Sequence, residues 1–167
     1  MRAMILALML LVGGPVLAQA AGTSLTLKSS AFPSGGAIPR QYTAYGENRS
    51  PPLSWRPAAG AKAYALTVRD PDAKPKTFTH WLVWNIPGSA TSLPEGGLAG
   101  VVEGRNDTGR IGYSGPHPPS GVHHYHFRIM ALDAPLTLPA GADFPALTKA
   151  TQGHVIGEGE LVGTFAK

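Results

Sequence analysis

Carboxylates, histidines and one tyrosine are the side chains of this sequence whose spacing can support binding or catalysis. The acids of Asp70-Pro71-Asp72 directly follow an apolar run, so they stand where a strand ends and a loop begins. A carboxylate at that place can orient a histidine, or it can cap the backbone of its own turn. The sequence leaves both roles open for Asp70 and Asp72.

A second group of candidates comes from the alternating run over 122–132. Because side chains alternate between the two faces of a strand, His123 and Tyr125 share one face, and His124 and His126 share the other. His123 and Tyr125 offer neighbouring hydrogen-bonding groups suited to an oxyanion. His124 and His126 have the types of zinc ligands, but no further ligand pair stands at recognisable spacing, so we expect no metal.

His80 opens the apolar run 81–86, where a histidine either faces a ligand or makes a satisfied hydrogen bond in the core. The later segment Gly112-Tyr113-Ser114-Gly115 lacks the second glycine of a nucleophile elbow. The prolines that follow it also prevent the helix which that motif needs. We therefore interpret 112–119 as a rigid pocket wall that contains Pro116, Pro118 and Pro119.

Composition favours one turn-rich globular domain. The 167 residues include 21 Gly and 16 Pro, and 43% are hydrophobic against 14% charged, which argues against disorder. The absence of Cys excludes disulfides, thiolate metal sites and a cysteine nucleophile. The formal net charge of +4 favours anionic ligands, but the basic residues are scattered, so we expect no nucleic-acid partner.

The first twenty residues have the pattern of a secretory signal peptide. Arg2 precedes an apolar run over 3–12, and Ala18-Gln19-Ala20 has the small-x-small form of a cleavage site. A membrane anchor is the alternative, but spanning a bilayer takes about 20 apolar residues, so we expect no transmembrane anchor. Cleavage after Ala20 leaves one domain over 21–167 in the periplasm or the medium.

Short apolar or alternating runs between turn signals predict a mainly β fold. Strands are expected over 24–28, 64–69, 81–86, 122–132 and 160–165. One helix is expected, with Asp143 as its N-cap and Gly153 closing it. No internal repeat or long linker divides the domain.

Four ordered motifs resemble the phosphatidylethanolamine-binding protein family, in particular its bacterial Raf-kinase-inhibitor-like branch. In chain order they are Asp70-Pro71-Asp72-Ala73, His80 to Pro87, Gly112 to Pro119, and His123-His124-Tyr125. The resemblance extends over nearly all of 24–166. It implies a large antiparallel sheet packed on a smaller sheet, with one or two short peripheral helices. It also implies a small cavity for phosphate or phosphorylated head groups.

The resemblance further assigns the residues of that cavity. Its ligand-binding residues carry over onto Asp70, His80, His123 and Tyr125, with Pro116, Pro118 and Pro119 as the wall. Secondary candidates are Asp72, Trp81, Tyr113 and His117. His124 departs from the arginine that the family usually shows at this place, which alters the charge near the mouth. No cofactor is implied.

The resemblance favours a secreted or periplasmic protein that binds a phosphate-like or head-group anion. Such a protein can also act as an inhibitor or an interaction scaffold, with a protein partner using the pocket. The alternative is a hydrolase for a phosphoester or acyl group, with His80 or His123 as general base oriented by Asp70. No activated nucleophile is recognisable, so we do not predict an enzyme. A homodimer formed through apolar surface is a further hypothesis.

Overall fold

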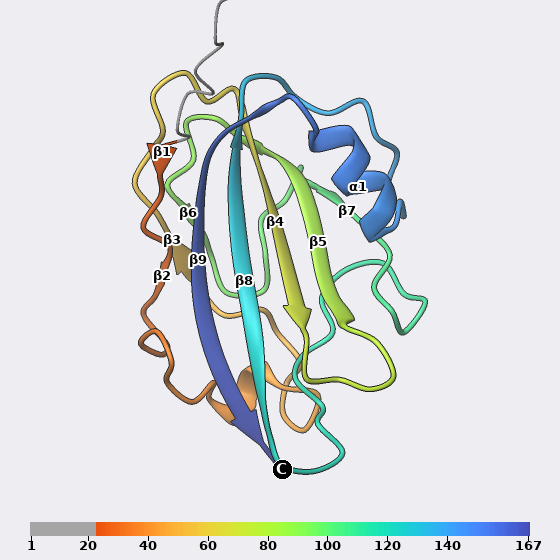
Figure 1. The fold of residues 1–167 in the computed structure, drawn as a ribbon. Helices are drawn as coiled ribbons and strands as arrows, with labels where there is room; N and C mark the ends of the chain where they lie inside the picture. Colours follow the sequence, from red (N-terminus) through yellow and green to blue (C-terminus); the bar gives the residue numbers. More distant parts are fainter. Residues whose placement is uncertain (1–22) are drawn as a thin grey trace, which may run out of the picture.

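Two β-sheets and one short α-helix make up the part of the chain that the computed structural model describes, residues 23–167 (Figure 1). The signal peptide expected over 1–20 lies outside these residues. Within them, the larger sheet has the strand order β1-β9-β8-β4-β5-β7 and the smaller has the order β2-β3-β6. The mainly β architecture predicted from the sequence is confirmed.

The larger sheet is built on four long strands. They are β4 (Ala63–Asp70), β5 (Phe78–Pro87), β8 (Val122–Leu132) and β9 (Val155–Ala166). These strands pair antiparallel, and short β7 (Val102–Glu103) joins β5 in the same sense. Short β1 (Thr23–Ser24) pairs parallel with β9, so the larger sheet is antiparallel apart from this edge.

The strand expected over 24–28 is divided between the two sheets. Its first residue, Ser24, belongs to β1. Its last residue, Lys28, begins β2 (Lys28–Ser29), which pairs with β3 (Leu53–Ser54), and β3 in turn pairs with β6 (Ser92–Leu93). Leu25 and Leu27 lie between these strands and are buried in the core. Their alternation therefore reflects burial where the chain crosses from one sheet to the other.

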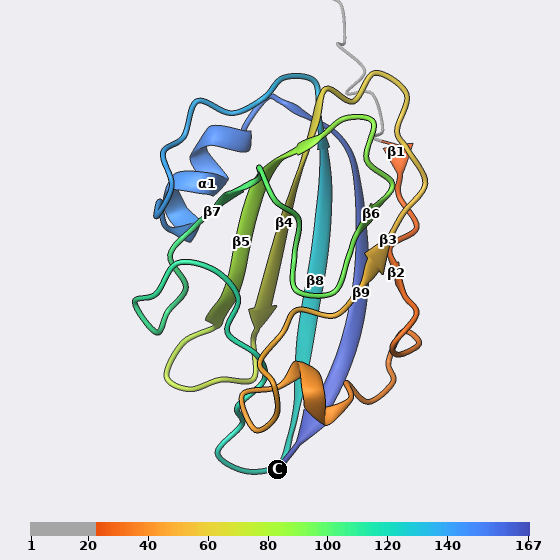
Figure 2. The same ribbon diagram turned by 180° about the vertical axis from the view of Figure 1, so that it is seen from behind.

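The smaller sheet covers one face of the larger sheet (Figure 2), and the main core lies between them. Val68 of β4, Trp81 of β5 and Phe127 of β8 point into this core because strand side chains alternate between faces. Helix α1 (Phe144–Thr151) covers part of the opposite face, where Trp84 and Leu147 belong to a second core.

The helix begins where the sequence predicted. The Asp143 side chain accepts a hydrogen bond of 3.0 Å from the backbone N–H of Ala146, which is an ordinary N-cap. The other helical segment is a 3-10 turn over Arg40–Tyr42. No helix within residues 23–167 is long and apolar enough to cross a bilayer.

Strand polarity brings distant loops to one end of the larger sheet. Strand β4 ends at Asp70, and its antiparallel neighbour β8 begins at Val122, so both meet at the same end. The turn after β4, the loop before β8 and the segment around the 3-10 turn gather there, at the bottom of Figures 1 and 2. The sheet therefore assembles polar loop residues that are far apart in the sequence.

Candidate functional site

A cavity of about 530 Å³ lies at this end of the larger sheet. This volume is within the range of about 300–1,000 Å³ that is usual for small-molecule sites. Its polar and proline lining residues are Asp70, Asp72, Lys74, His80, Thr108, Ser114, His117, Pro118, Pro119, Ser120 and His123. The structure thus brings together seven of the residues named from the sequence.

Asp70 holds both the turn after β4 and a histidine of the cavity. Its Oδ1 accepts hydrogen bonds from the backbone N–H groups of Asp72 at 2.8 Å and Ala73 at 3.2 Å. Its Oδ2 lies 2.6 Å from Nδ1 of His123. Asp70 therefore has both roles that the sequence left open, because it caps the backbone of its own turn and orients a histidine. Since the Nδ1–H of His123 donates to Asp70, Nε2 is the ring atom left for a ligand.

His80 lies on β5 and is almost fully buried. Its Nδ1 is 2.6 Å from the carbonyl oxygen of Ser114, so the Nδ1–H donates to that carbonyl. Burial lowers the pKa of His80, and the Ser114 carbonyl opposes this shift in part. The neutral ring therefore offers Nε2 to a ligand as a hydrogen-bond acceptor.

Tyr125 does not line the cavity but packs behind His80. The two rings meet edge to face, with centroids 5.2 Å apart. Among residues 23–167, the buried hydroxyl of Tyr125 has no hydrogen-bond partner of ordinary geometry. Burial and, secondarily, the negative charge of Asp70 raise the pKa of Tyr125. Tyr125 is therefore a neutral O–H donor at physiological pH.

The mouth of the cavity carries charges of both signs. Asp72 Oδ2 accepts hydrogen bonds of 2.8 Å from both the backbone N–H and Nδ1 of His124. The side-chain bond is the main reason that the pKa of Asp72 lies below its ordinary value. Lys74 also lines the cavity, and sequence reasoning missed it. When the histidines are neutral, the lining therefore contains two carboxylates and one lysine, and its net charge is negative.

The proline wall is fixed by residues far away in the sequence. Asn48, at a positive φ of 57°, accepts a 2.7 Å hydrogen bond from the backbone N–H of Gly115. The carbonyl of Pro116 accepts from the backbone N–H of Ala44 at 3.0 Å, which places the buried Pro116 behind the lining. A Cβ on Gly115 would lie 2.5 Å from the carbonyl oxygen of Tyr42, so only glycine fits.

Trp81 and Tyr113, two of the secondary candidates, do not line the cavity. The Trp81 indole N–H donates to Glu103 at 2.7 Å, and the Tyr113 hydroxyl donates to the carbonyl of Tyr42 at 2.7 Å. Their rings meet edge to face with centroids 5.6 Å apart. Both side chains thus pack against the loops from the core side.

The two histidines considered as zinc ligands are bonded to different acids. His124 contacts Asp72, and Nδ1 of His126 lies 3.1 Å from Glu160 on β9. Within residues 23–167, no group of three or more His, Cys, Asp or Glu side chains is arranged to hold a metal ion.

Comparison with known proteins supports the resemblance noted in the sequence. Residues 28–166 match the family model described as phosphatidylethanolamine-binding protein. A UPF0098 protein of Methanothermobacter thermautotrophicus is 48% identical over 150 residues, covering 86% of this chain and 99% of the relative. A Mycobacterium tuberculosis protein named as lipoprotein LppC is 41% identical over 148 residues, covering 87% of this chain and 74% of that protein.

A solved structure shows the same fold. CT736 of Chlamydia trachomatis, described as a phosphatidylethanolamine-binding protein homologue, superposes with a TM-score of 0.83. The two sequences are 38% identical, and the match covers 87% of this chain and 99% of CT736. The chain therefore belongs to the phosphatidylethanolamine-binding protein family, whose members bind anionic ligands such as phospholipid head groups.

Proposed function

We propose that the cavity binds a small phosphorylated anion and that binding takes up a proton. The observation that supports this most is the matched pair of histidines, His80 and His123. Each has its Nδ1 bonded to a protein acceptor, and each lines the cavity. Each therefore keeps Nε2 for a ligand, and Nε2 donates a hydrogen bond to an anion only when the ring is an imidazolium.

The charges of the lining explain why a proton is needed. Asp70 and Asp72 outnumber Lys74 when the histidines are neutral, so this lining does not attract a dianion. Protonation of His123 on binding removes this excess. A phosphate that keeps one O–H can also donate to neutral His80, which sulfate cannot do. Charge-assisted hydrogen bonds contribute about 1.5–3 kcal/mol each, so a few of them give useful affinity.

A zwitterionic head group fits the mixed charge better than inorganic phosphate does. The phosphate of phosphoethanolamine would contact the histidines and Lys74, and its ammonium group would lie near Asp72 at the mouth. Because hydrogen bonding to His124 lowers the pKa of Asp72, this carboxylate is ionised at neutral pH. We therefore expect phosphoethanolamine to bind more tightly than phosphate, and phosphate more tightly than sulfate.

Calorimetric titration with these three ligands tests the proposal. Titrations at pH 5.5, 7 and 8, in paired buffers of different ionisation enthalpy, report the protons taken up on binding. We expect proton uptake at pH 7 and tighter binding at pH 5.5 than at pH 8. The sulfate series reports the protons taken up by the protein alone, because sulfate itself does not titrate in this range.

A matched pair of histidine variants identifies the site. We expect His123→Ala to weaken phosphate binding about tenfold or more, equivalent to at least about 1.4 kcal/mol. His154→Ala is the control, because His154 pairs with Asp133 at the opposite end of β8 and β9. Unchanged affinity in His123→Ala, or binding without proton uptake, would contradict the proposal.

The hydrolase alternative gains no support from the comparisons, and no observation on the described residues favours it over binding. Export is a separate part of the proposal. It is supported by the signal pattern over 1–20 and by the relative named as a lipoprotein. Intact-mass measurement of the protein expressed in a bacterial host with its full N-terminus tests this. We expect a periplasmic chain beginning at Ala21, and an uncleaved cytoplasmic chain would contradict export.

A further inference from the structure

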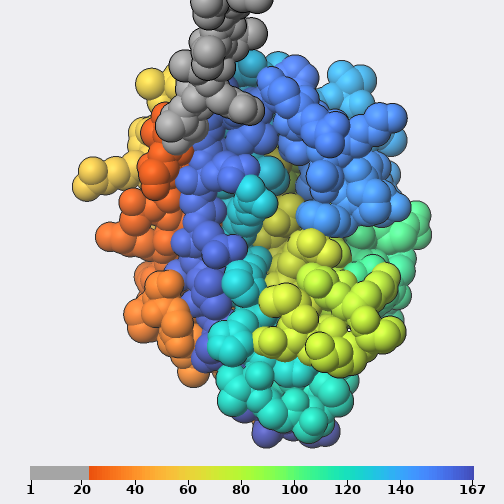
Figure 3. Space-filling view, in the orientation of Figure 1, coloured from red at the N-terminus to blue at the C-terminus, as the bar shows by residue number. Residues whose placement is uncertain are grey.

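A groove of about 530 Å³ lies on the face of the larger sheet that is opposite the smaller sheet. Strands β4, β8 and β9 form its floor, and helix α1 forms one wall. Figure 3 shows this face, with β8 and β4 between β9 and α1. The charged residues of the floor are Arg69 on β4, His126 and Arg128 on β8, and Glu158 and Glu160 on β9.

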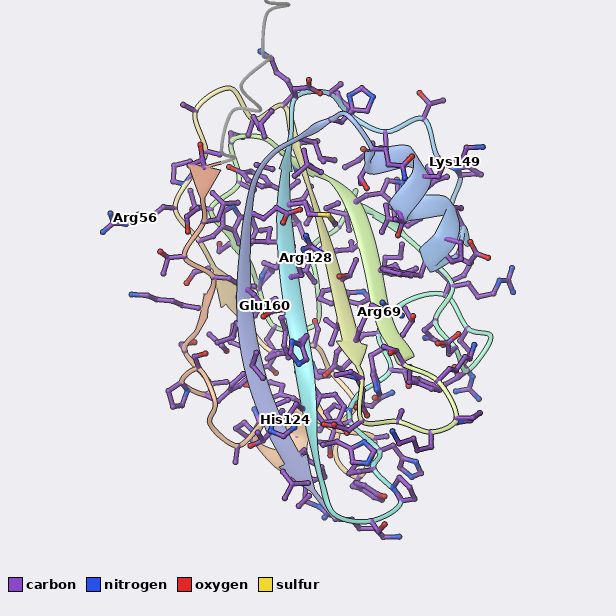
Figure 4. All side chains as sticks on the ribbon, in the orientation of Figure 1. Arg56, Arg69, His124, Arg128, Lys149 and Glu160 are labelled. Carbon is purple, nitrogen blue, oxygen red and sulfur yellow. The ribbon has the colours of Figure 1, made fainter. Side chains whose placement is uncertain are left out.

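Both acids of the groove are bonded to bases on the neighbouring strand. Arg128 forms an ion pair with Glu158, and His126 hydrogen-bonds to Glu160 at 3.1 Å. Figure 4 labels Arg69, Arg128 and Glu160 on this side of the sheet. Arg128 and Glu158 offset each other, and Glu160 is held by His126, so Arg69 is the cation of the groove that has no ion-pair partner.

Among residues 23–167 no acid lies within ion-pair distance of Arg69, and Asp107 acts on its charge only at longer range. Its Nε is buried and makes no hydrogen bond within the same part of the chain. Its guanidinium lies over the ring of Phe144, 3.7 Å from the ring centroid, at the start of α1. This stacking holds the planar group in one orientation, and a buried N–H without an acceptor is costly unless a ligand supplies one.

The remainder of the groove offers apolar contact. Met130 and Val155 line it from β8 and β9, and Phe144 lines it from the helix. A ligand held by Arg69 can therefore place a hydrocarbon chain against these side chains, which removes apolar surface from water. The combination of one unpartnered cation and an apolar wall suits an amphipathic anion.

We infer that this groove is a second binding site, for an organic monocarboxylate with a short apolar chain held by Arg69. The guanidinium presents parallel N–H groups that match a carboxylate in a bidentate pair. A dianionic phosphate fits less well, because Glu158 and Glu160 stand in the same groove and would repel the second charge. This site does not depend on the cavity, since Arg69 and Asp70 point to opposite faces of β4.

Titration of the isotopically labelled protein with hexanoate tests the inference by NMR. The amide shifts are expected to concentrate in the groove, at β8 and in the segment between α1 and β9. 1-Hexanol is the uncharged control, and inorganic phosphate tests whether any anion is sufficient. Judged from the amide shifts of the groove alone, we expect hexanoate to bind there at least about tenfold more tightly than either of them.

Variants separate the groove from the cavity. Arg69→Met keeps an apolar stem over Phe144 and removes the charge, so hexanoate affinity is expected to fall about tenfold or more, whereas Arg69→Lys retains part of it. His123→Ala is expected to leave hexanoate binding unchanged. Thermal unfolding verifies that each variant is folded. Equal binding by Arg69→Met, equal binding of hexanol, or shifts confined to the cavity would each overturn the inference.

Discussion

Asp70 Oδ2 and His123 Nδ1 lie 2.6 Å apart, and the same carboxylate closes the turn after β4 through Oδ1. One buried side chain therefore ends the strand and fixes which nitrogen of His123 carries the proton in the neutral ring. Turn geometry and ligand chemistry are coupled at this residue. Substitutions of Asp70 can separate the two.

The variant Asp70→Asn is expected to move the ring proton of His123. The backbone N–H groups of Asp72 and Ala73 require an acceptor, so the amide oxygen stays in the turn and the NH₂ group faces His123. Nδ1 must then accept, and Nε2 carries the proton in the neutral ring. Phosphate binding should therefore lose most of its proton uptake. Nitrogen chemical shifts of His123 measure the tautomer, and calorimetry measures the protons.

Asp70→Ala is the matched comparison for the turn. It removes both acceptors and leaves two backbone N–H groups without the carboxylate, so we expect a loss of about 1–3 kcal/mol in the free energy of unfolding. Asp70→Asn should lose clearly less. An Nδ1-protonated neutral ring in Asp70→Asn would show that Asp70 does not determine the tautomer.

The lowered pKa of His80 predicts how stability depends on pH. In the unfolded chain this histidine titrates near 6.5, and burial lowers its pKa in the folded chain. Below pH 6.5 the unfolded chain therefore binds more protons, and the free energy of unfolding falls as the pH falls towards the folded pKa. His80→Gln cannot titrate, so its stability should fall less between pH 7.5 and pH 5.

Urea unfolding of both proteins at several pH values measures this difference. The other histidines are common to the two proteins, so their contributions largely cancel in the comparison. Parallel pH profiles for the wild type and His80→Gln would mean that burial does not shift the titration of His80.

The sequence predicts those features that depend on strand periodicity. β8 spans Val122–Leu132, as predicted, because alternation persists along its whole length. The same alternation correctly separates His123 and Tyr125 from His124 and His126. Periodicity identifies the face of a strand but not the depth of a side chain. The alternation therefore did not predict that Tyr125 lies behind His80 and not in the cavity wall.

Features that depend on loop packing were not predictable in this way. The hydrogen bond from Gly115 to Asn48 joins two irregular segments, which have no period to indicate contact. Lys74 follows the recognised acid turn, and only the path of the loop shows that it lines the cavity. The unpartnered state of Arg69 likewise depends on strand register and on the docking of α1.

Tyr125→Phe is expected to keep or raise the stability of the protein and to lower its affinity for phosphate. The deleted hydroxyl is buried and has no hydrogen-bond partner of ordinary geometry among the described residues, so its removal should leave stability unchanged or raise it by up to about 1 kcal/mol. The hydroxyl lies behind the cavity lining, so phosphate affinity should fall less than in His123→Ala, by about fivefold or less, equivalent to about 1 kcal/mol. Chemical denaturation and calorimetry measure the two effects. Destabilisation with unchanged affinity would assign Tyr125 a purely structural role.

Asn48 is expected to control the cavity wall without contacting the ligand. Asn48→Gly tolerates the positive φ but removes the acceptor of the Gly115 N–H, so we expect a loss of about 1–2 kcal/mol in the free energy of unfolding and weaker phosphate binding.

Asn48→Asp separates two properties of Asn48, its hydrogen-bond acceptor and its lack of charge. It keeps an oxygen for the Gly115 N–H and also tolerates the left-handed conformation, so its stability should stay close to that of the wild type. Its added negative charge is expected to weaken anion binding, and this loss should shrink at high ionic strength because salt screens it. Asn48→Gly lacks that charge, so its loss of affinity should persist in salt. Stability that is equal in all three proteins would show that this hydrogen bond does not hold the wall in place.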